Sequence, residues 1–160
     1  MQLTQVRDVP IPQDQVWAAI TDARILQACI PGCDSLERVS AIQYNIHVVT
    51  RIGPLNATFN GEMRLENMHP PDSYTLVAIG KGGVAGVARG EAHLKLSPIE
   101  VDGQEGTRLS YTINAVVGGK LARLGSRLVD AVAMKMANHF FEKFILQITA
   151  ARNKELDQQN

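Results

Sequence analysis

The middle of the chain alternates hydrophobic and polar residues with a period of two, as strands with one buried face do. The run from Leu55 to Glu66 is the clearest, because every second residue is apolar or glycine and the residues between them are polar. Weaker or more apolar runs, separated by Pro, Gly and Asp turn residues, predict further strands at 2–9, 42–48, 74–80, 86–96 and 108–115. The pattern therefore indicates a sheet made mainly of consecutive antiparallel strands.

Helical spacing appears at both ends of this strand-rich region. Val16, Trp17 and Ile20 predict one short helix, and Asp22 opens a second one that ends near Cys29. A long helix without proline is predicted from Lys120 to about Arg152. We expect a single domain over residues 1–152, followed by a polar, frayed tail at 153–160.

This order of elements predicts an α+β fold. Strands that follow one another, with the helices kept apart from them, are typical of antiparallel sheets rather than of βαβ units. One face of each alternating strand is polar, so the other face must be covered, and only the C-terminal helix is long enough. We therefore expect a curved antiparallel sheet of about seven strands around a long C-terminal helix, with two short helices after the first strand.

The strand predicted at 86–96 has unusually small residues on its inner face. Gly86, Ala88, Gly90 and Ala92 occupy alternate positions before leucine appears. Glycine weakens a strand and often marks the close approach of another group. Two interpretations stay open: the long helix approaches the sheet closely there, or a ligand cavity lies between the sheet and the helix.

Any ligand of such a cavity is expected to be mostly apolar. The residues predicted to point inward carry no charge, so a charge buried on the ligand would have no partner. The candidate cavity residues come from the inner side of the strands and from the start of the long helix: Tyr44, Phe59, Met63, Leu76, Ala88, Ala92, Leu94, Tyr111, Ile113, Leu121, Leu124 and Leu128.

The long helix has two different apolar sides. Leu121, Leu124 and Leu128 lie on one of them, whereas Phe141 and Ile148 lie on another. A straight helix on a single sheet keeps one apolar side. Either the helix bends around the sheet, or one segment meets a ligand, a second copy of the chain or a membrane.

Lys120, Arg123 and Arg127 share a third side of the predicted helix. They lie in its first turns, where the helix dipole disfavours cations. This placement suggests attraction to an anionic surface, such as lipid headgroups or an acidic partner, although a solvated basic face has the same pattern. We treat these residues as a candidate surface contact.

Composition narrows the class of protein. The 160-residue chain has 16 Lys and Arg against 16 Asp and Glu, and this balance argues against a dedicated nucleic-acid-binding protein. It shows no secretory signal pattern and no run of about 18 apolar residues, so a cytoplasmic protein is expected.

Two cysteines flank a Pro-Gly corner in the stretch ACIPGCDSLE, residues 28–37. Their spacing is C-x3-C rather than the C-x2-C of zinc knuckles, and no histidine is near enough in sequence to complete a ligand set. Pro31 and Gly32 are expected to end a helix and to precede a strand. We expect both thiols to be free and to bind no metal.

Candidate catalytic residues are not found. The chain has no sequence motif of a metalloprotease, a serine hydrolase or a phosphate-binding loop. His47 and His93 fall on the outward side of their strands, where histidines are usually solvated. The residues themselves thus predict no catalysis and no cofactor.

Four segments together resemble a known family. They are CIPGCDSLE, IGPLNATFNGEMRLE, GKGGVAGVARGEAHLKL and the block LSYTINAVVGGKLARLGSRLVDAVAMKMANHFFEKF. In this order they are similar to the carbon monoxide dehydrogenase CoxG family, which belongs to the START-like (SRPBCC), helix-grip superfamily. The resemblance covers roughly residues 2–146 and implies a helix-grip fold with a lipophilic cavity.

The resemblance also implies an accessory role beside molybdenum hydroxylases such as carbon monoxide dehydrogenase. Such a protein would bring the enzyme to the inner face of the membrane by peripheral contact, or bind a quinone that takes its electrons. The implied partners are an apolar small molecule and the enzyme complex, and a homodimer stays open. Two alternatives remain: an assembly protein without a ligand, and a cavity enzyme, which an inward ionisable residue would favour.

Overall fold

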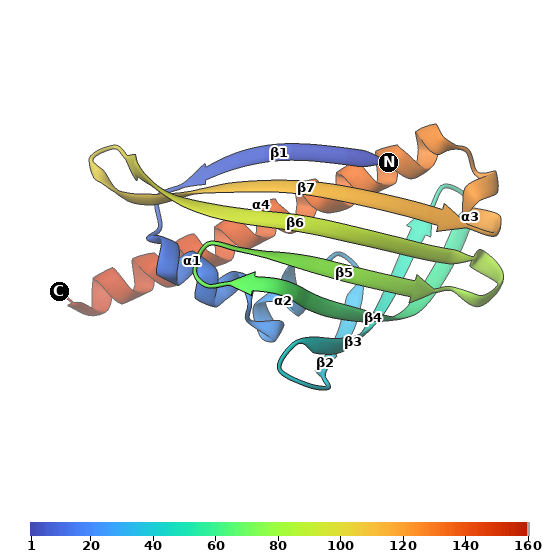
Figure 1. The fold of residues 1–160 in the computed structure, drawn as a ribbon, viewed down its shortest axis with the longest axis horizontal. Coiled ribbons are helices and arrows are strands. Elements are labelled where there is room, and N and C mark those ends of the chain that lie inside the picture. Colours follow the sequence, from blue (N-terminus) through green and yellow to red (C-terminus); the bar gives the residue numbers. More distant parts are fainter. Residues whose placement is uncertain (160) are drawn as a thin grey trace.

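Seven antiparallel strands form one curved sheet, in the spatial order β1-β7-β6-β5-β4-β3-β2 (Figure 1). The computed structural model describes residues 1–159. The strands are β1 Gln2–Val9, β2 Cys33–Arg38, β3 Gln43–Ile52, β4 Leu55–His69, β5 Ser73–Lys81, β6 Val87–Val101 and β7 Gln104–Gly118. The helices are α1 Gln13–Ile20, α2 Ala23–Cys29, α3 Lys120–Arg123 and α4 Ser126–Gln159, with a short 3-10 helix η1 at Gly83–Ala85. The predicted α+β fold is confirmed.

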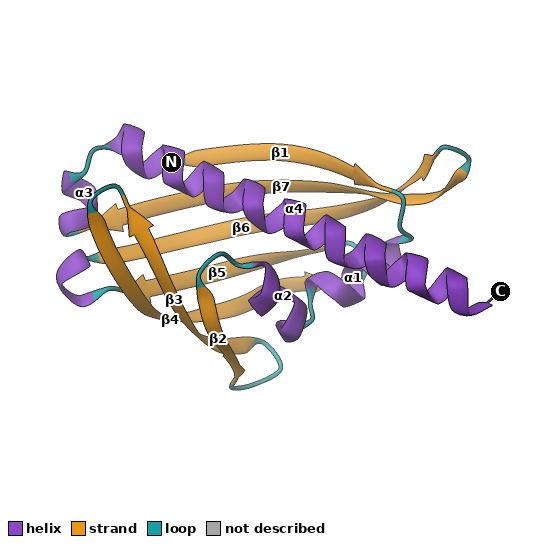
Figure 2. Cartoon of the chain, turned by 180° about the vertical axis from the view of Figure 1, so that it is seen from behind, coloured by secondary structure: helices purple, strands orange, loops and turns teal. Residues whose placement is uncertain are grey.

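The helix α4 crosses the concave face of the sheet diagonally, and α1 and α2 lie beside its C-terminal half (Figure 2). The convex face is polar, as the alternation predicts. On β6, for example, Arg89, Glu91 and Lys95 are exposed, whereas Leu94 and Leu96 are buried on the other side. Period-two sequence patterns therefore assign the two faces of the sheet correctly.

The main hydrophobic core lies under the C-terminal half of α4. The buried residues of this helix are Ala137, Phe141, Phe144 and Ile148. The last three belong to one cluster with buried residues of α1, α2 and most of the strands. A smaller cluster of Ala57, Phe59, Ala85 and Leu121 lies at the end of the molecule that carries α3. The N-terminal half of α4 contributes no buried residue to either cluster.

Local sequence signals account for the corner between α2 and β2. The Asp22 side chain accepts a hydrogen bond of 2.9 Å from the backbone N–H of Arg24, and this caps α2. Gly32 has a φ of +77°, and a Cβ atom there would overlap the carbonyl oxygen of Val49. Only glycine fits this corner, because the conformation is left-handed and the neighbouring strand is close.

The long C-terminal helix is interrupted, which corrects the sequence prediction. α3 ends at Arg123, Gly125 has a φ of +93°, and α4 begins at Ser126. Leu121 and Phe141 therefore belong to different helices and need not share one side. This break explains part of the change of apolar side that the sequence shows.

The C-terminal end of α4 also differs from the expectation. Residues 153–159 are helical and exposed, whereas a frayed tail was expected from 153 onward. Asn160 lies outside the described residues. Helix-forming residues such as Lys154, Glu155 and Leu156 continue the helix without packing against the sheet. The limit of the domain at residue 152 stays a prediction.

Two inward glycines distinguish close packing from free space. At Gly61 an added Cβ atom would overlap the carbonyl oxygen of Ile79, whereas at Gly90 the nearest atom is the Asn114 carbonyl oxygen at 3.6 Å. We expect Gly61→Ala to lower the free energy of unfolding by about 1–3 kcal/mol through overpacking. Gly90→Ala should leave it unchanged or raise it by up to about 1 kcal/mol, because glycine is costly within a strand. Urea denaturation measures both, and equal destabilisation by the two variants would contradict this difference.

Candidate ligand cavity

Two neighbouring apolar cavities lie between the sheet and α4. The first has a volume of about 300 Å³ and the second of about 260 Å³. Ile46 and Ala78 line both of them, so the two share part of their wall. We call the first the outer compartment and the second the inner compartment. Together they reach the size of ordinary small-molecule sites, which begin at about 300 Å³.

The outer compartment lies under the N-terminal half of α4, where Val129, Val132, Ala133 and Met136 form its helix wall. These four side chains are only partly buried, in contrast to the second half of the helix. Leu121 of α3 closes the compartment at the end where α3 approaches the β3–β4 turn (Figure 2). The helix and the sheet thus diverge toward this end.

The inner compartment has two hydroxyl groups in its wall, and both are engaged elsewhere. The Tyr74 hydroxyl donates a 3.1 Å hydrogen bond to the carbonyl oxygen of Ile20. The Tyr111 hydroxyl pairs with the side-chain oxygen of Gln5. Complete burial raises the pKa of Tyr74 well above its ordinary value, so this hydroxyl stays protonated. The inner compartment consequently offers a ligand only apolar contacts.

An aromatic cluster forms one wall of the inner compartment. The rings of Tyr111 and Phe141 are stacked with their centroids 3.9 Å apart, and Phe140 meets Phe141 edge to face at 4.8 Å. All three residues line the compartment. Stacked and edge-to-face rings pack rigidly, so this wall is a fixed boundary between the cavity and the main core.

Most of the predicted cavity residues lie at these compartments. The outer compartment is lined by Phe59, Ala88 and Leu121, and the inner compartment by Met63, Leu76, Ala92, Leu94, Tyr111 and Ile113. Tyr44, Leu124 and Leu128 line neither of them. Tyr44 belongs to the main core, Leu124 packs on the smaller cluster, and Leu128 lies against Gly53. That these residues hold a ligand stays a prediction.

The small residues near the start of β6 do not all serve the same purpose. Ala88 and Gly90 border the outer compartment and Ala92 borders the inner one. Gly86 instead precedes β6 with a φ of +113°, and a Cβ atom there would overlap the carbonyl oxygen of Gly118. Free space therefore accompanies the small residues within the strand, and close packing accompanies the glycine before it.

Two polar residues of β1 also point inward, contrary to the prediction from the sequence. Gln5 and Arg7 alternate with the strand's outward residues and share the phase of Leu3 and Val9, which are buried, so all four lie on the inner side. The expectation that no charged residue points inward is therefore wrong. The period-two relation of Arg7 to Leu3 and Val9 was the available signal.

Arg7 ties the edge strand β1 to α4. Its guanidinium donates to the Tyr111 hydroxyl at 3.4 Å and to the Asn138 side-chain oxygen at 3.2 Å. It also lies 5.9 Å from the centre of the Phe141 ring, within the range of a cation–π contact. Arg7 itself does not line the inner compartment. Its contacts support the aromatic wall from behind and hold the sheet edge against the helix.

The predicted basic contact residues are exposed, but they do not share one helix side. Lys120 and Arg123 lie on α3, and Arg127 lies beyond the break at Gly125 on α4. The single helical stripe expected from the sequence is therefore wrong. Leu121 lines the outer compartment between Lys120 and Arg123, so the basic residues flank that compartment.

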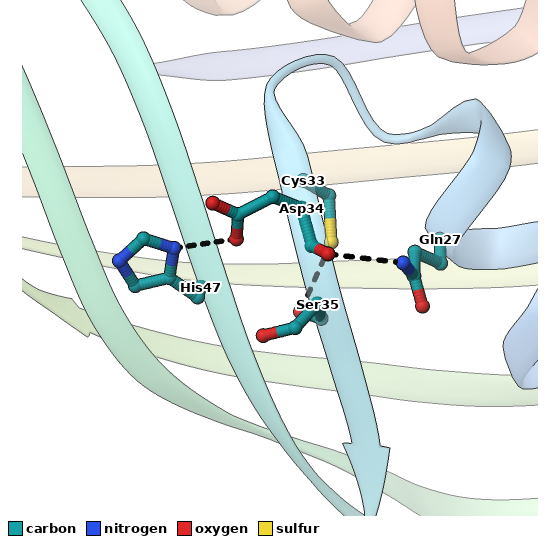
Figure 3. A network of polar contacts seen from close by, with 5 residues as sticks. All are labelled: Gln27, Cys33, Asp34, Ser35 and His47. Atoms are coloured by element: carbon teal, nitrogen blue, oxygen red, sulfur yellow. Dashed lines mark hydrogen bonds and ion pairs between the residues drawn. The ribbon is translucent and has the colours of Figure 1, made fainter.

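Polar contacts join α2, β2 and β3 around the Pro-Gly corner (Figure 3). The Gln27 side chain donates to the backbone oxygen of Asp34 at 3.2 Å. The Asp34 carboxylate pairs with Nδ1 of His47. Among residues 1–159, no hydroxyl or thiol side chain is hydrogen-bonded to His47, so the pair is not arranged as the base of a nucleophilic enzyme.

The two cysteines form part of the same corner. Cys29 is fully buried, and the Cys33 thiol donates to the Ser35 carbonyl oxygen at 3.3 Å. Both thiols are free, and no cluster of three or more His, Cys, Asp or Glu that could hold a metal ion exists in the described part of the chain. The corner places Ile30 in the wall of the inner compartment.

The convex face of the sheet carries a broad polar hollow of about 600 Å³. It is lined by residues of β2 to β5, among them Glu37, His47, Asn60 and Glu62. These side chains belong to the outward phase of their strands, so the sheet separates the hollow from both compartments. The hollow therefore does not form part of the candidate cavity.

Comparison with protein families gives one match. The sequence model of the CoxG family, which is named for a component of carbon monoxide dehydrogenase, matches residues 6–149. No curated protein matches the chain significantly. The family match covers nearly all of the sheet and most of α4.

Solved structures share the fold. A conserved protein from Geobacillus kaustophilus is 30% identical, with a TM-score of 0.85, over 94% of this chain and 97% of that one. A START superfamily protein from Mycobacterium smegmatis is 11% identical, with a TM-score of 0.69, over 94% and 98%. The Zhui aromatase/cyclase from Streptomyces sp. R1128 is 12% identical, with a TM-score of 0.64, over 93% of each chain. The helix-grip, START-like fold predicted from the sequence is confirmed.

The helices give no sign of a membrane span. None of those within residues 1–159 combines the length and the apolar composition needed to cross a bilayer. The 34-residue α4 is long enough, but its charged and polar residues keep its mean hydropathy low.

The burial of the cysteines predicts their reactivity. Loss of solvent raises the pKa of the Cys29 thiol and of the Cys33 thiol, so little reactive thiolate is present near neutral pH. We expect iodoacetamide at pH 8 to modify both more slowly than in the unfolded chain, and Cys33 before the fully buried Cys29. Mass spectrometry of timed samples measures this order. Faster modification of Cys29, or stoichiometric zinc or iron in protein purified without chelator, would contradict the structural role of this corner.

Proposed function

The chain belongs to the carbon monoxide dehydrogenase CoxG family, and we propose that it is a non-enzymatic accessory protein that holds an apolar ligand between its sheet and α4. The ligand is a lipid or a quinone-like molecule, and the partner is a molybdenum hydroxylase of the carbon monoxide dehydrogenase type. The observation that carries the proposal is the pair of adjoining compartments with almost entirely apolar walls.

The physical cost of such empty space supports a ligand. Apolar walls without partner atoms lose dispersion contacts and leave the core less stable than a filled one. A chain that needed only a stable core would fill this space with larger residues at positions such as Ala88, Ala92 and Gly90. Small residues here are explained if an apolar molecule completes the packing.

The chemistry of the walls supports binding rather than catalysis. Catalysis on a bound molecule requires a titratable or nucleophilic group within hydrogen-bond reach of it. In the inner compartment the hydroxyls of Tyr74 and Tyr111 are already engaged with Ile20 and Gln5. An accessory role agrees with this arrangement, since the family is named for a component of a larger enzyme.

The main test is chemical identification of a bound molecule, combined with a cavity-filling variant. We expect organic extraction of the denatured protein to release a lipid or a quinone in stoichiometric amount. Ala88→Leu should reduce binding of the neutral probe Nile red at least severalfold, because the larger side chain occupies the outer compartment. The melting temperature should hold or rise, since the variant fills empty space.

The matched control is Val87→Leu, one residue earlier on the same strand. Val87 is 43% exposed and faces the convex side, so this change adds apolar volume outside the cavity. It should alter neither probe binding nor melting. If Ala88→Leu instead destabilises the protein by about 1–3 kcal/mol, as overpacking does, and no ligand is recovered, an assembly protein without a ligand is the better function.

Peripheral membrane contact is the second part of the proposal. The end of the molecule that carries the exposed Lys120, Arg123 and Arg127 also exposes Val84 and Val116, which are 77% and 70% accessible. Cations beside exposed apolar side chains suit the headgroup region of an anionic membrane. This contact would place the outer compartment next to the lipid.

Charge reversal tests the membrane contact. We expect Lys120→Glu/Arg123→Glu/Arg127→Glu to abolish sedimentation with vesicles containing phosphatidylglycerol, because each cation near such a surface contributes about 1 kcal/mol. Vesicles of phosphatidylcholine alone should bind neither protein. Circular dichroism checks that the exposed substitutions leave the fold intact. Wild-type protein that does not sediment with anionic vesicles would exclude this contact.

A further inference from the structure

Positive charge is concentrated around the outer compartment, although the chain as a whole is neutral. The turns and strand ends at this end of the molecule come from residues 48–61, 80–90 and 115–129, and these segments contain no Asp or Glu. They carry the exposed cations Arg51, Lys81, Arg89, Lys120, Arg123 and Arg127.

None of these cations is neutralised by an ion pair within residues 1–159. The ion pairs of that part of the chain involve other residues, such as Arg108 with Asp8 and Arg64 with Glu66. Arg51 donates to the carbonyl oxygen of Gly53, at 3.2 Å, and not to a carboxylate. The positive field at this end is therefore available to a charge that approaches from outside.

The cations lie within reach of the outer compartment. Arg89 is part of its wall, Arg51 lies between the wall residues Thr50 and Ile52, and Lys81 follows Gly80. Lys120 precedes Leu121 in the same way. Consecutive Cα atoms are about 3.8 Å apart, so each of these long side chains starts at the boundary of the cavity.

The interior of the cavity excludes a charged or strongly polar group. The inner compartment has no free hydrogen-bonding side chain, since its two tyrosine hydroxyls are engaged. In the outer compartment, Thr50 and Arg89 are the polar side chains of the wall. A polar head group buried deep in this space would lose its hydration without compensation, so it must stay at the basic end.

We propose that the ligand is an amphiphile with a long apolar chain and an anionic head group. The chain occupies the outer and inner compartments, and the head, a carboxylate or a phosphate, lies outside them among Arg51, Lys120, Arg123 and neighbouring cations. This inference rests on the proposed function, because it assumes that a molecule occupies the cavity. It favours an acidic lipid over a neutral quinone-like molecule.

The test compares molecules that share one chain and differ only in the head. Dodecanoate, dodecyl phosphate and dodecanol are titrated below their critical micelle concentrations against the full chain loaded with Nile red. We expect at least one of the two anions to displace the probe at a concentration tenfold or more below that of dodecanol. In 0.5 M salt this ratio should shrink toward one, because exposed charges are then screened.

Variants assign the preference to the basic end. Lys120→Glu/Arg123→Glu/Arg127→Glu should remove the anion preference and leave dodecanol displacement unchanged, which also shows that the cavity is intact. The control Lys95→Glu/Lys154→Glu changes exposed cations away from this end and should keep the preference. The anion that binds more tightly identifies the head group as carboxylate or phosphate.

The outcomes separate the two proposals. If dodecanol displaces the probe as well as both anions do, or if the triple variant keeps the anion preference, the anionic head group is wrong and the apolar carrier still stands. If Nile red does not bind and none of the three molecules is bound in native mass spectrometry, the ligand-holding function itself is wrong.

Discussion

The structure depends on one geometric constraint: a single helix must cover the concave face of a seven-stranded sheet. A helix is about 10–12 Å wide with its side chains, whereas neighbouring strands are spaced by about 4.8 Å, so one helix covers only two or three strands at a time. α4 meets this constraint by crossing the sheet diagonally (Figure 2). Its second half, with Phe141 and Phe144, closes against the sheet with the help of α1 and α2. Its first half has no such helpers and stands away from the strands.

The two compartments follow from this divergence. Where α4 is supported, aromatic side chains fill the space and Arg7 of β1 holds the sheet edge to Asn138 of the helix. Where it is not supported, contact is restored only near its start, where Leu128 lies against Gly53 and Leu121 of α3 is buried. The break at Gly125 makes this second contact possible, because α3 turns down onto the smaller cluster while α4 continues across the sheet. A cavity between two anchored ends is the result.

The parts that could be predicted from the sequence are those governed by local periodicity. The alternation along β4 and β6 assigns their inner and outer faces, and the Pro-Gly corner after Cys29 marks the change from helix to strand. The break in the helix was missed because a helix tolerates one glycine, and nothing local reveals that Gly125 is left-handed. Arg7 was missed because β1 is an edge strand with polar residues on both sides. Its inward direction becomes clear only when Tyr111 and Asn138 are placed beside it. Tyr44, Leu124 and Leu128 were expected at the cavity because they lie on the correct side, but side alone does not determine which residues border free space.

The distribution of charge shows why the overall balance is a poor guide to function in this protein. Sixteen cations and sixteen anions cancel in the sum, and that sum excludes only partners that need a large net charge. The carboxylates are found elsewhere, for example Glu100, Asp102 and Glu105 at the β6–β7 turn, whereas the long acid-free segments meet at the outer compartment. Three segments far apart in the sequence reach this end only because β3–β4, β5–β6 and β7–α3 all turn there (Figure 1). The fold therefore converts a neutral chain into a molecule with a positive end, and the wide end of the sheet-helix cavity opens at that end. An apolar interior gives no direction to a ligand, but a charged rim does, so the segregation of charge is what would orient an amphiphile in the cavity.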